Sequence, residues 1–184
     1  MSFTDSPRLS SPEALRALGH PTRLRILAHL QLRGDATATE CADAVGESPS
    51  ACSYHLRALA RQGFVEQVPS ADGRERRWHA RVVSLDFDAS AEADDELRAA
   101  STVARAALLE LSDENVRAYL THEHSFPPAW REAASFLQTT ITVTPAELEQ
   151  IARQIQELFA TYRRARAPRG ARFVDVSVRA VPKP

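Results

Sequence analysis

Apolar and polar positions recur with helical spacing in two short stretches that meet at a tight, glycine-containing turn. In the first stretch Thr37 and Glu40 have the spacing of a capping box, in which each side chain bonds an amide of the first turn. The second stretch opens with Ser48, a good N-cap residue, and Pro49, whose missing N–H costs nothing at the first helical position. Apolar residues then repeat on one face of each stretch. The pattern predicts a helix-turn-helix.

The spacing changes to a period of two after Gly63. Phe64, Val65 and Val68 form a β-prone run, and a second run follows in which apolar residues alternate with arginine and histidine. An Asp-Gly pair, a strong turn signal, separates the two runs. We therefore expect a β-hairpin wing, and three arginines lie at or just after its tip: Arg74, Arg76 and Arg77.

The polar face of the second helix carries small hydrogen-bonding groups, one aromatic ring and guanidinium groups. Small side chains let a backbone approach base edges, and arginine pairs with guanine or holds a phosphate. A solvated amphipathic helix would explain this face equally well, but a solvated hairpin would mix its charges more than this wing does. We expect the helix spanning residues 48–62 to enter the major groove of double-stranded DNA, with direct contacts from Ser50, Ser53, Tyr54 and Arg57. The three wing arginines would follow the backbone or minor groove.

Two segments carry a resemblance to a known family. Residues 53–66 read SYHLRALARQGFVE and look like the recognition-helix signature of ArsR-type winged-helix regulators, and residues 17–27, ALGHPTRLRIL, resemble the opening helices of that family. Together the segments cover about the first half of the chain. The resemblance implies a homodimeric bacterial transcriptional regulator, commonly a repressor that releases DNA when an effector binds. Thr22 and Arg23 lie at the N-terminus of the helix expected to begin after His20, upstream of the helix-turn-helix, and are further candidates for a phosphate contact.

Composition is that of an ordinary globular protein, with 43% apolar and 26% charged residues among 184. The net charge of −1 is unevenly distributed. Residues 1–85 carry 11 basic and 9 acidic groups, residues 86–124 carry 3 and 10, and residues 125–184 carry 9 and 5. With so weak a global field, DNA binding would depend on local basic clusters and on dimerisation. The sequence shows no signal peptide and no apolar run of membrane-spanning length, so we expect a cytoplasmic protein without membrane contact.

The pattern after residue 85 predicts a second module, made of helices and strands without a DNA-binding motif. A long alanine-rich helix begins near Leu97 and is a candidate dimer interface, although it could equally pack only on its own chain. Ser112 and Asp113 would cap a further helix. Residues 138–144 indicate a strand, Thr144 opens a regular amphipathic helix, and residues 173–181 indicate a last strand. The two strands would pair within one chain or across a dimer.

The predicted fold is therefore mainly α with small β elements, an α+β chain. Residues 1–85 form a winged helix-turn-helix DNA-binding domain, and residues 86–184 form a helical and strand-helix-strand module for dimerisation and possible effector binding. Aromatic density makes Tyr119, Trp130 and Phe136 candidates for an apolar or amphipathic small-molecule effector, with packing as the competing interpretation.

Other chemistry finds little support in the sequence. Cys41 and Cys52 fall at core positions without a second cysteine beside either, which argues against a metal site. His55 is expected to pack and to hydrogen-bond within the winged helix-turn-helix domain. No phosphate loop, nucleophile elbow or metalloprotease motif is present, so we predict neither an enzyme nor a cofactor. The alternative function is a winged-helix protein-interaction module without specific DNA binding.

Overall fold

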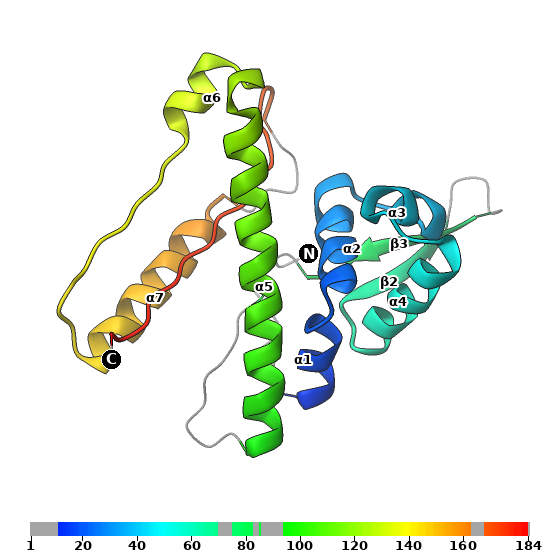
Figure 1. Cartoon of the computed structure of the whole chain (residues 1–184), viewed down its shortest axis with the longest axis horizontal. Coiled ribbons are helices and arrows are strands. Elements are labelled where there is room, and N and C mark those ends of the chain that lie inside the picture. Colours follow the sequence, from blue (N-terminus) through cyan, green and yellow to red (C-terminus); the bar gives the residue numbers. More distant parts are fainter. Residues whose placement is uncertain (1–10, 70–74, 83–84, 86–93, 163–167, 184) are drawn as a thin grey trace. The chain divides into compact units, whose positions relative to one another are not determined.

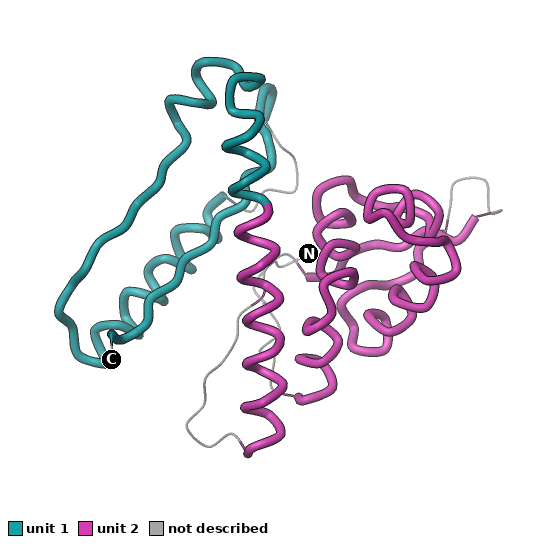
Figure 2. Tube along the Cα trace, in the orientation of Figure 1, with its two compact units in different colours: residues 1–5, 115–184 teal, residues 6–114 magenta. Residues whose placement is uncertain are grey.

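A computed structural model describes residues 11–69, 75–82, 85, 94–162 and 168–183 (Figure 1). The chain divides into two compact units (Figure 2). We call residues 6–114, magenta in Figure 2 and labelled unit 2 there, the first unit in chain order, and residues 115–184, teal and labelled unit 1, the second unit. The division falls within one long helix. The first unit extends to Glu114 because an alanine stripe of that helix joins its core.

The first unit begins with four helices and a small sheet. Their bounds are Pro12–Leu18 (α1), Pro21–Arg33 (α2), Ala38–Val45 (α3) and Pro49–Arg61 (α4), with strands Ala36–Thr37 (β1), Val65–Pro69 (β2) and Arg76–Ala80 (β3). The strands are antiparallel in the order β1-β3-β2, with Ala36 opposite Trp78 and Val65 opposite Ala80. This is the helix-turn-helix and wing that the sequence predicts. The mainly α, α+β fold class is confirmed.

Local capping chemistry sets three of the helix starts. The predicted capping box of Thr37 and Glu40 opens α3, and the Ser48 side chain accepts from the amide of Ala51 to open α4. The Ser11 side chain accepts from the amide of Ala14 to open α1. Gly46 ends α3 at φ 74, in the left-handed region that glycine adopts without a steric cost.

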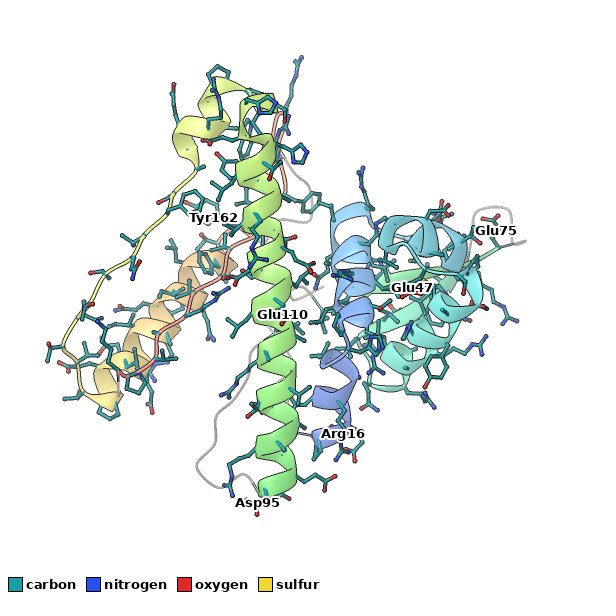
Figure 3. The ribbon with its side chains drawn as sticks, in the orientation of Figure 1. Arg16, Glu47, Glu75, Asp95, Glu110 and Tyr162 are labelled. Atoms are coloured by element: carbon teal, nitrogen blue, oxygen red, sulfur yellow. The ribbon has the colours of Figure 1, made fainter. Side chains whose placement is uncertain are left out.

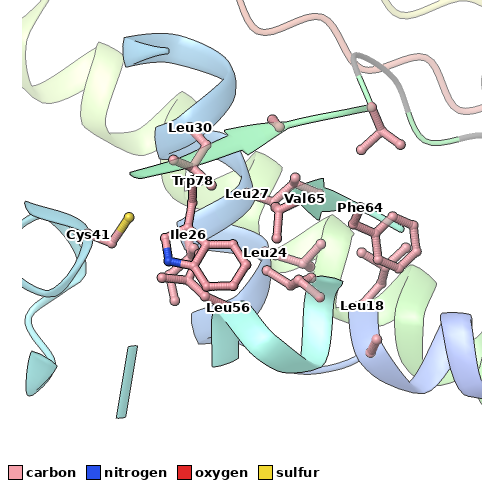
Figure 4. Packing of buried hydrophobic residues seen from close by; sticks show 14 of the residues in the cluster. Leu18, Leu24, Ile26, Leu27, Leu30, Cys41, Leu56, Phe64, Val65 and Trp78 are labelled. Carbon is pink, nitrogen blue, oxygen red and sulfur yellow. The ribbon is translucent and has the colours of Figure 1, made fainter. Parts of the chain in front are cut away.

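The core of the first unit lies between the inner face of α4, the helix α2 and the sheet (Figure 4). Fully buried side chains come from every element around it, including Leu24, Ile26, Leu56, Phe64 and Val65. Cys41 and Cys52 are each 0% exposed and free, as the core interpretation requires. Burial raises the pKa of the Cys41 thiol to about 11, so that thiol stays protonated and inert at neutral pH.

The long helix α5 runs from Asp95 to His122 without a break. The prediction of a separate helix capped by Ser112 is wrong: Ser112 is buried inside the continuous helix, and neither glycine nor proline interrupts it there. Its alanine stripe packs on the first unit, and ion pairs add two further links, Arg16 with Glu96 and Arg25 with Glu114 at 2.7 Å. The sequence left open whether this helix forms a dimer interface or packs on its own chain, and the structure shows its alanine stripe packed on its own chain.

The second unit contains the end of α5, a short 3₁₀ turn η1 (Glu123–Ser125), and the helices α6 (Pro128–Ala133) and α7 (Pro145–Ala160). The capping box of Thr144 and Glu147 opens α7 as predicted. The two predicted strands are not found: residues 134–144 and 171–183 run as irregular chain, because no described segment lies hydrogen-bonded beside either. Pairing within one chain is thus excluded for these described residues.

No side chain among the described residues of the second unit is buried. Large apolar groups in the described part of this unit are exposed to solvent; Leu137 is 87% exposed and Val181 is 81% exposed. The structure also contains no described helix that is both long and apolar enough to cross a membrane.

Candidate nucleic-acid interface

Helix α4 separates its two faces sharply. Cys52, Leu56 and Leu59 on the inner face are 0% exposed, while Tyr54 on the outer face is 60% exposed. Ser50 and Arg57 are also exposed, and Ser53 is half-buried. Because the inner face anchors the helix in the core, the outer side chains are presented from a rigid support.

The outer face is hollowed along the second half of α4. A shallow depression of about 550 Å³ is lined by Tyr54, Arg57, Ala60 and Arg61. Arg57 and Arg61 are four residues apart, one turn along the same face, and α4 contains no acidic side chain. The depression is therefore basic and open, a surface that suits a phosphate-lined groove. Arg61, which the sequence prediction did not include, lines this depression beside Tyr54 and Arg57, and its four-residue spacing from Arg57 was the sequence signal that could have found it.

The start of α4 offers small polar groups. The Ser48 hydroxyl, which caps the helix, lies 3.1 Å from the hydroxyl of Ser50. Both residues are exposed at the positive end of the helix dipole. This end can approach a DNA backbone closely because no bulky side chain precedes Tyr54 on it.

A pair of histidines packs behind the recognition face. The rings of His20 and His55 are 4.6 Å apart, and His55 lies 5.5 Å from the ring of Tyr54 on the same helix. His55 is buried as predicted, but its Nδ1, like that of His20, has no hydrogen-bond partner among the described residues. Burial lowers the pKa of both imidazoles, and the nearby Arg23 guanidinium lowers it further. Two neutral rings thus fix the position of α4 against the start of α2.

The two candidate phosphate-binding residues at the start of α2, Thr22 and Arg23, each form a hydrogen bond inside the protein. Thr22 is 8% exposed, and its hydroxyl donates to the Glu47 carboxylate at 3.4 Å, a long bond. Arg23 donates from Nη2 to the backbone oxygen of Arg16 at 2.9 Å, and burial lowers the pKa of its guanidinium. Thr22 therefore acts within the fold, while Arg23 is half-buried beside Tyr54 and Arg61.

The wing arginines differ in position. Arg74 lies outside the described residues, and Arg76 is exposed at the start of β3, opposite Pro69. Arg77 turns back: its Nη2 donates to the Asp35 backbone oxygen at 2.7 Å and to the Glu40 carboxylate at 3.1 Å. Glu75, labelled in Figure 3 at the outer end of the hairpin just before β3, lies 3.8 Å from Arg77 Nη1.

Those contacts give Arg77 a part in holding the wing. Together with His79, whose Nδ1 lies 2.7 Å from the Asp35 carboxylate, Arg77 links β3 to the segment that precedes α3. Sequence spacing could not show this, because Asp35 and Glu40 are about forty residues away along the chain.

Part of the chain is similar to known proteins. Residues 18–68, from the end of α1 to β2, match a family described as a helix-turn-helix domain. Similar solved structures include a MarR family transcriptional regulator from Silicibacter pomeroyi, at 17% identity, 77% coverage of this chain, 71% of that chain and a TM-score of 0.32. Another is the YusO protein from Bacillus subtilis, at 18% identity, 80% and 82% coverage and a TM-score of 0.34. No curated protein matches the sequence.

At TM-scores this low, the solved structures add no argument, and the class follows from the chain itself and from the domain match. The N-terminal unit is a winged helix-turn-helix, and its geometry and its family match support a DNA-binding transcriptional regulator.

Proposed function

We propose that this chain is a homodimeric, ArsR-type bacterial repressor that inserts α4 into the major groove of its operator. The observation that carries the proposal is the outer face of α4, an exposed basic surface with a fully buried back. Arg57 would pair with a guanine edge, and Tyr54 would pack on a thymine methyl or bond a phosphate. Ser50 and Ser53 would meet bases or backbone at the start of the helix.

The wing and the start of α2 would add sequence-independent contacts. We propose that Arg76 and Arg74 follow the backbone or the minor groove, while Arg77 keeps the wing in position through Glu40 and Asp35. Arg23 would hold a phosphate beside Tyr54. Thr22 would support that contact through its bond to Glu47.

Dimerisation would use the surfaces that the chain leaves uncovered. Val103 is 55% exposed and Leu109 42% exposed on α5, outside its buried alanine stripe, and the second unit has no buried side chain in its described part. A second copy would cover these apolar groups and place two α4 helices on successive major grooves. The second unit would also bind an effector near Tyr119, Trp130 and Phe136.

The test is the affinity for the DNA upstream of the chain's own gene, measured by fluorescence anisotropy against a scrambled duplex over a salt series. Arg57→Ala should weaken binding to the natural fragment by about 1–3 kcal/mol. Arg105→Ala, which removes an exposed arginine on α5, is the matched control and should bind like the wild type.

Two results would contradict the proposal. Equal affinity for natural and scrambled DNA would show no sequence reading. A loss no greater for Arg57→Ala than for Arg105→Ala would remove α4 from the interface and favour a winged helix that binds protein.

A further inference from the structure

Four aromatic side chains of the second unit gather at the end of α5. The ring of Tyr119 lies 5.4 Å from that of Phe126 and 6.3 Å from that of Phe136. Trp130 on α6 joins them through a shared neighbour, Arg172. The three predicted effector residues are therefore brought into one cluster, together with Phe126, which the sequence did not single out.

The cluster is not a closed hydrophobic core. Tyr119, Phe126 and Trp130 are half-buried, and Phe136 is 66% exposed. Rings that pack only to build a core lose most of their exposed area, as Phe64 does in the first unit. These rings keep open surface, as all described side chains of the second unit do, so that a guest could still reach them.

A cation already occupies the cluster. The guanidinium carbon of Arg172 lies 5.5 Å from the ring centre of Phe126 and 5.9 Å from that of Trp130. Both distances lie within cation–π range, where the negative face of an aromatic ring attracts a positive group. Among the described residues no carboxylate forms an ion pair with Arg172, so the two rings are the contacts that hold its charged end.

The surroundings favour a positive guest. The Tyr119 hydroxyl donates to the Glu123 carboxylate at 3.4 Å, a long hydrogen bond that keeps a negative group at the edge of the cluster. The chain carrying Arg172 is also tied to α5, because Asn115 donates to the Asp175 carboxylate at 3.2 Å. Arg172 is thus held near the rings by its own segment, as an internal occupant.

We propose that the cluster of Tyr119, Phe126, Trp130 and Phe136 is a binding site for a small organic cation, which takes the place of the Arg172 guanidinium. A quaternary ammonium or a guanidinium compound has the diffuse positive charge and weak hydration that such rings select. This inference rests on the proposed effector function and specifies its ligand class. Release of Arg172 would remove its contacts with Phe126 and Trp130 and leave the Asn115–Asp175 hydrogen bond as a tie between this segment and α5, which links ligand binding to the chain that follows α7.

The experiment is isothermal titration calorimetry of the full chain with choline and with its uncharged isostere 3,3-dimethylbutan-1-ol, at constant ionic strength. We expect choline to bind and the isostere to bind at least tenfold more weakly. Arg172→Ala should tighten choline binding several-fold, because an internal competitor is removed. Trp130→Ala should abolish it.

Arg169→Ala is the matched control: it removes an exposed arginine three residues away and should leave choline affinity unchanged. Circular dichroism of each variant checks that α7 and the end of α5 stay folded. If choline fails to bind the wild type, if the isostere binds equally, or if Arg172→Ala binds no tighter, the inference is overturned.

DNA binding of the same preparations separates this result from the proposed function. Specific DNA binding without choline binding would leave the regulator standing and remove the cation site. Choline binding without specific DNA binding would do the reverse.

Discussion

The two units use the same kinds of helix and differ in what covers them. In the first, α4 buries Leu56 and Leu59 completely against a shared core. In the second, α7 has an equally regular apolar stripe, yet Leu158 is 55% exposed and Ile151 is only half-buried. A helical pattern therefore fixes where an apolar face forms, while the burial of that face depends on what lies against it.

The first unit has a hydrophobic core of its own, whereas the second unit needs contacts from outside one chain to become stable. Apolar burial is the main source of folding free energy, and no side chain in the described part of the second unit is fully buried. We therefore expect the first unit to dominate the unfolding of the isolated chain and the second to depend on a partner copy.

Truncating a core leucine in each unit tests the contrast directly. Leu56→Ala should lower the free energy of unfolding by about 2–5 kcal/mol, because the side chain is fully buried and leaves a cavity. Leu158→Ala should change it by no more than about 0.5 kcal/mol at protein concentrations where the chain is monomeric. Urea denaturation followed by circular dichroism measures both. Equal losses would show that the second unit has a core of its own.

An acidic substitution on the exposed C-terminal segment tests whether a second copy covers it. Val176 is 55% exposed, and Val176→Asp should weaken dimerisation by about 2 kcal/mol or more if an interface desolvates the new carboxylate. Leu32→Asp makes the same change at a 45% exposed position of α2 in the first unit and should leave the dimer intact. Sedimentation equilibrium distinguishes them, and a dimer that tolerates Val176→Asp would place the interface elsewhere.

Removing a helix cap from each unit compares local chemistry in two settings. Ser48→Ala deletes the cap of α4 and should lower the stability of the main unfolding transition by about 1 kcal/mol. Thr144→Ala deletes the capping box of α7 and should reduce helix content while leaving the main transition of the monomer in place. Thermal unfolding monitored at a helical wavelength reports both quantities. A shift of the main transition by Thr144→Ala would show that the two units unfold together.

The pH dependence of stability should follow the packed histidine pair, in which His55 is buried and His20 is half-buried. The pKa of His20 and the pKa of His55 are lowered in the folded chain. Well above pH 6.5, the ordinary histidine pKa, both imidazoles are neutral in the folded and in the unfolded chain, so stability is fully retained there. As the pH falls below that value, the unfolded chain binds protons first and stability declines until the folded imidazoles are themselves protonated.

The groups facing this pair are Arg23 on α2, Glu47 before α4 and Tyr54 on α4. Arg23 opposes protonation and Glu47 favours it. His55→Gln should flatten the decline measured by urea titrations between pH 7 and pH 5. A decline of the same size in that variant would assign the effect to other groups.

Local chemistry explains what the sequence could predict. The caps at Ser48, at Thr37 with Glu40 and at Thr144 with Glu147 each involve residues three apart, so a pattern is enough to find them. The inner and outer faces of α4 follow from its period for the same reason. The wing follows from alternation and a turn signal.

The sequence could not predict features that depend on contacts between distant residues, and two of its strand predictions were wrong. Strand β1 contains two residues and exists only through its pairing with β3. The Arg77 contacts and the packing of His20 on His55 join segments far apart in the chain. The predicted strands at 138–144 and 173–181 have strand-like composition, but a strand also needs a neighbour, which composition cannot supply.

The most direct test of the central claim is methylation interference on the natural upstream fragment. Dimethyl sulfate methylates guanine N7 in the major groove and adenine N3 in the minor groove, so it reports which groove α4 occupies. If α4 lies in the major groove, we expect interference at guanines in two half-sites about one helical turn apart, with one guanine per half-site released from interference in Arg57→Ala. Interference confined to adenines, or a guanine pattern unchanged by Arg57→Ala, would contradict the placement of α4 in the major groove.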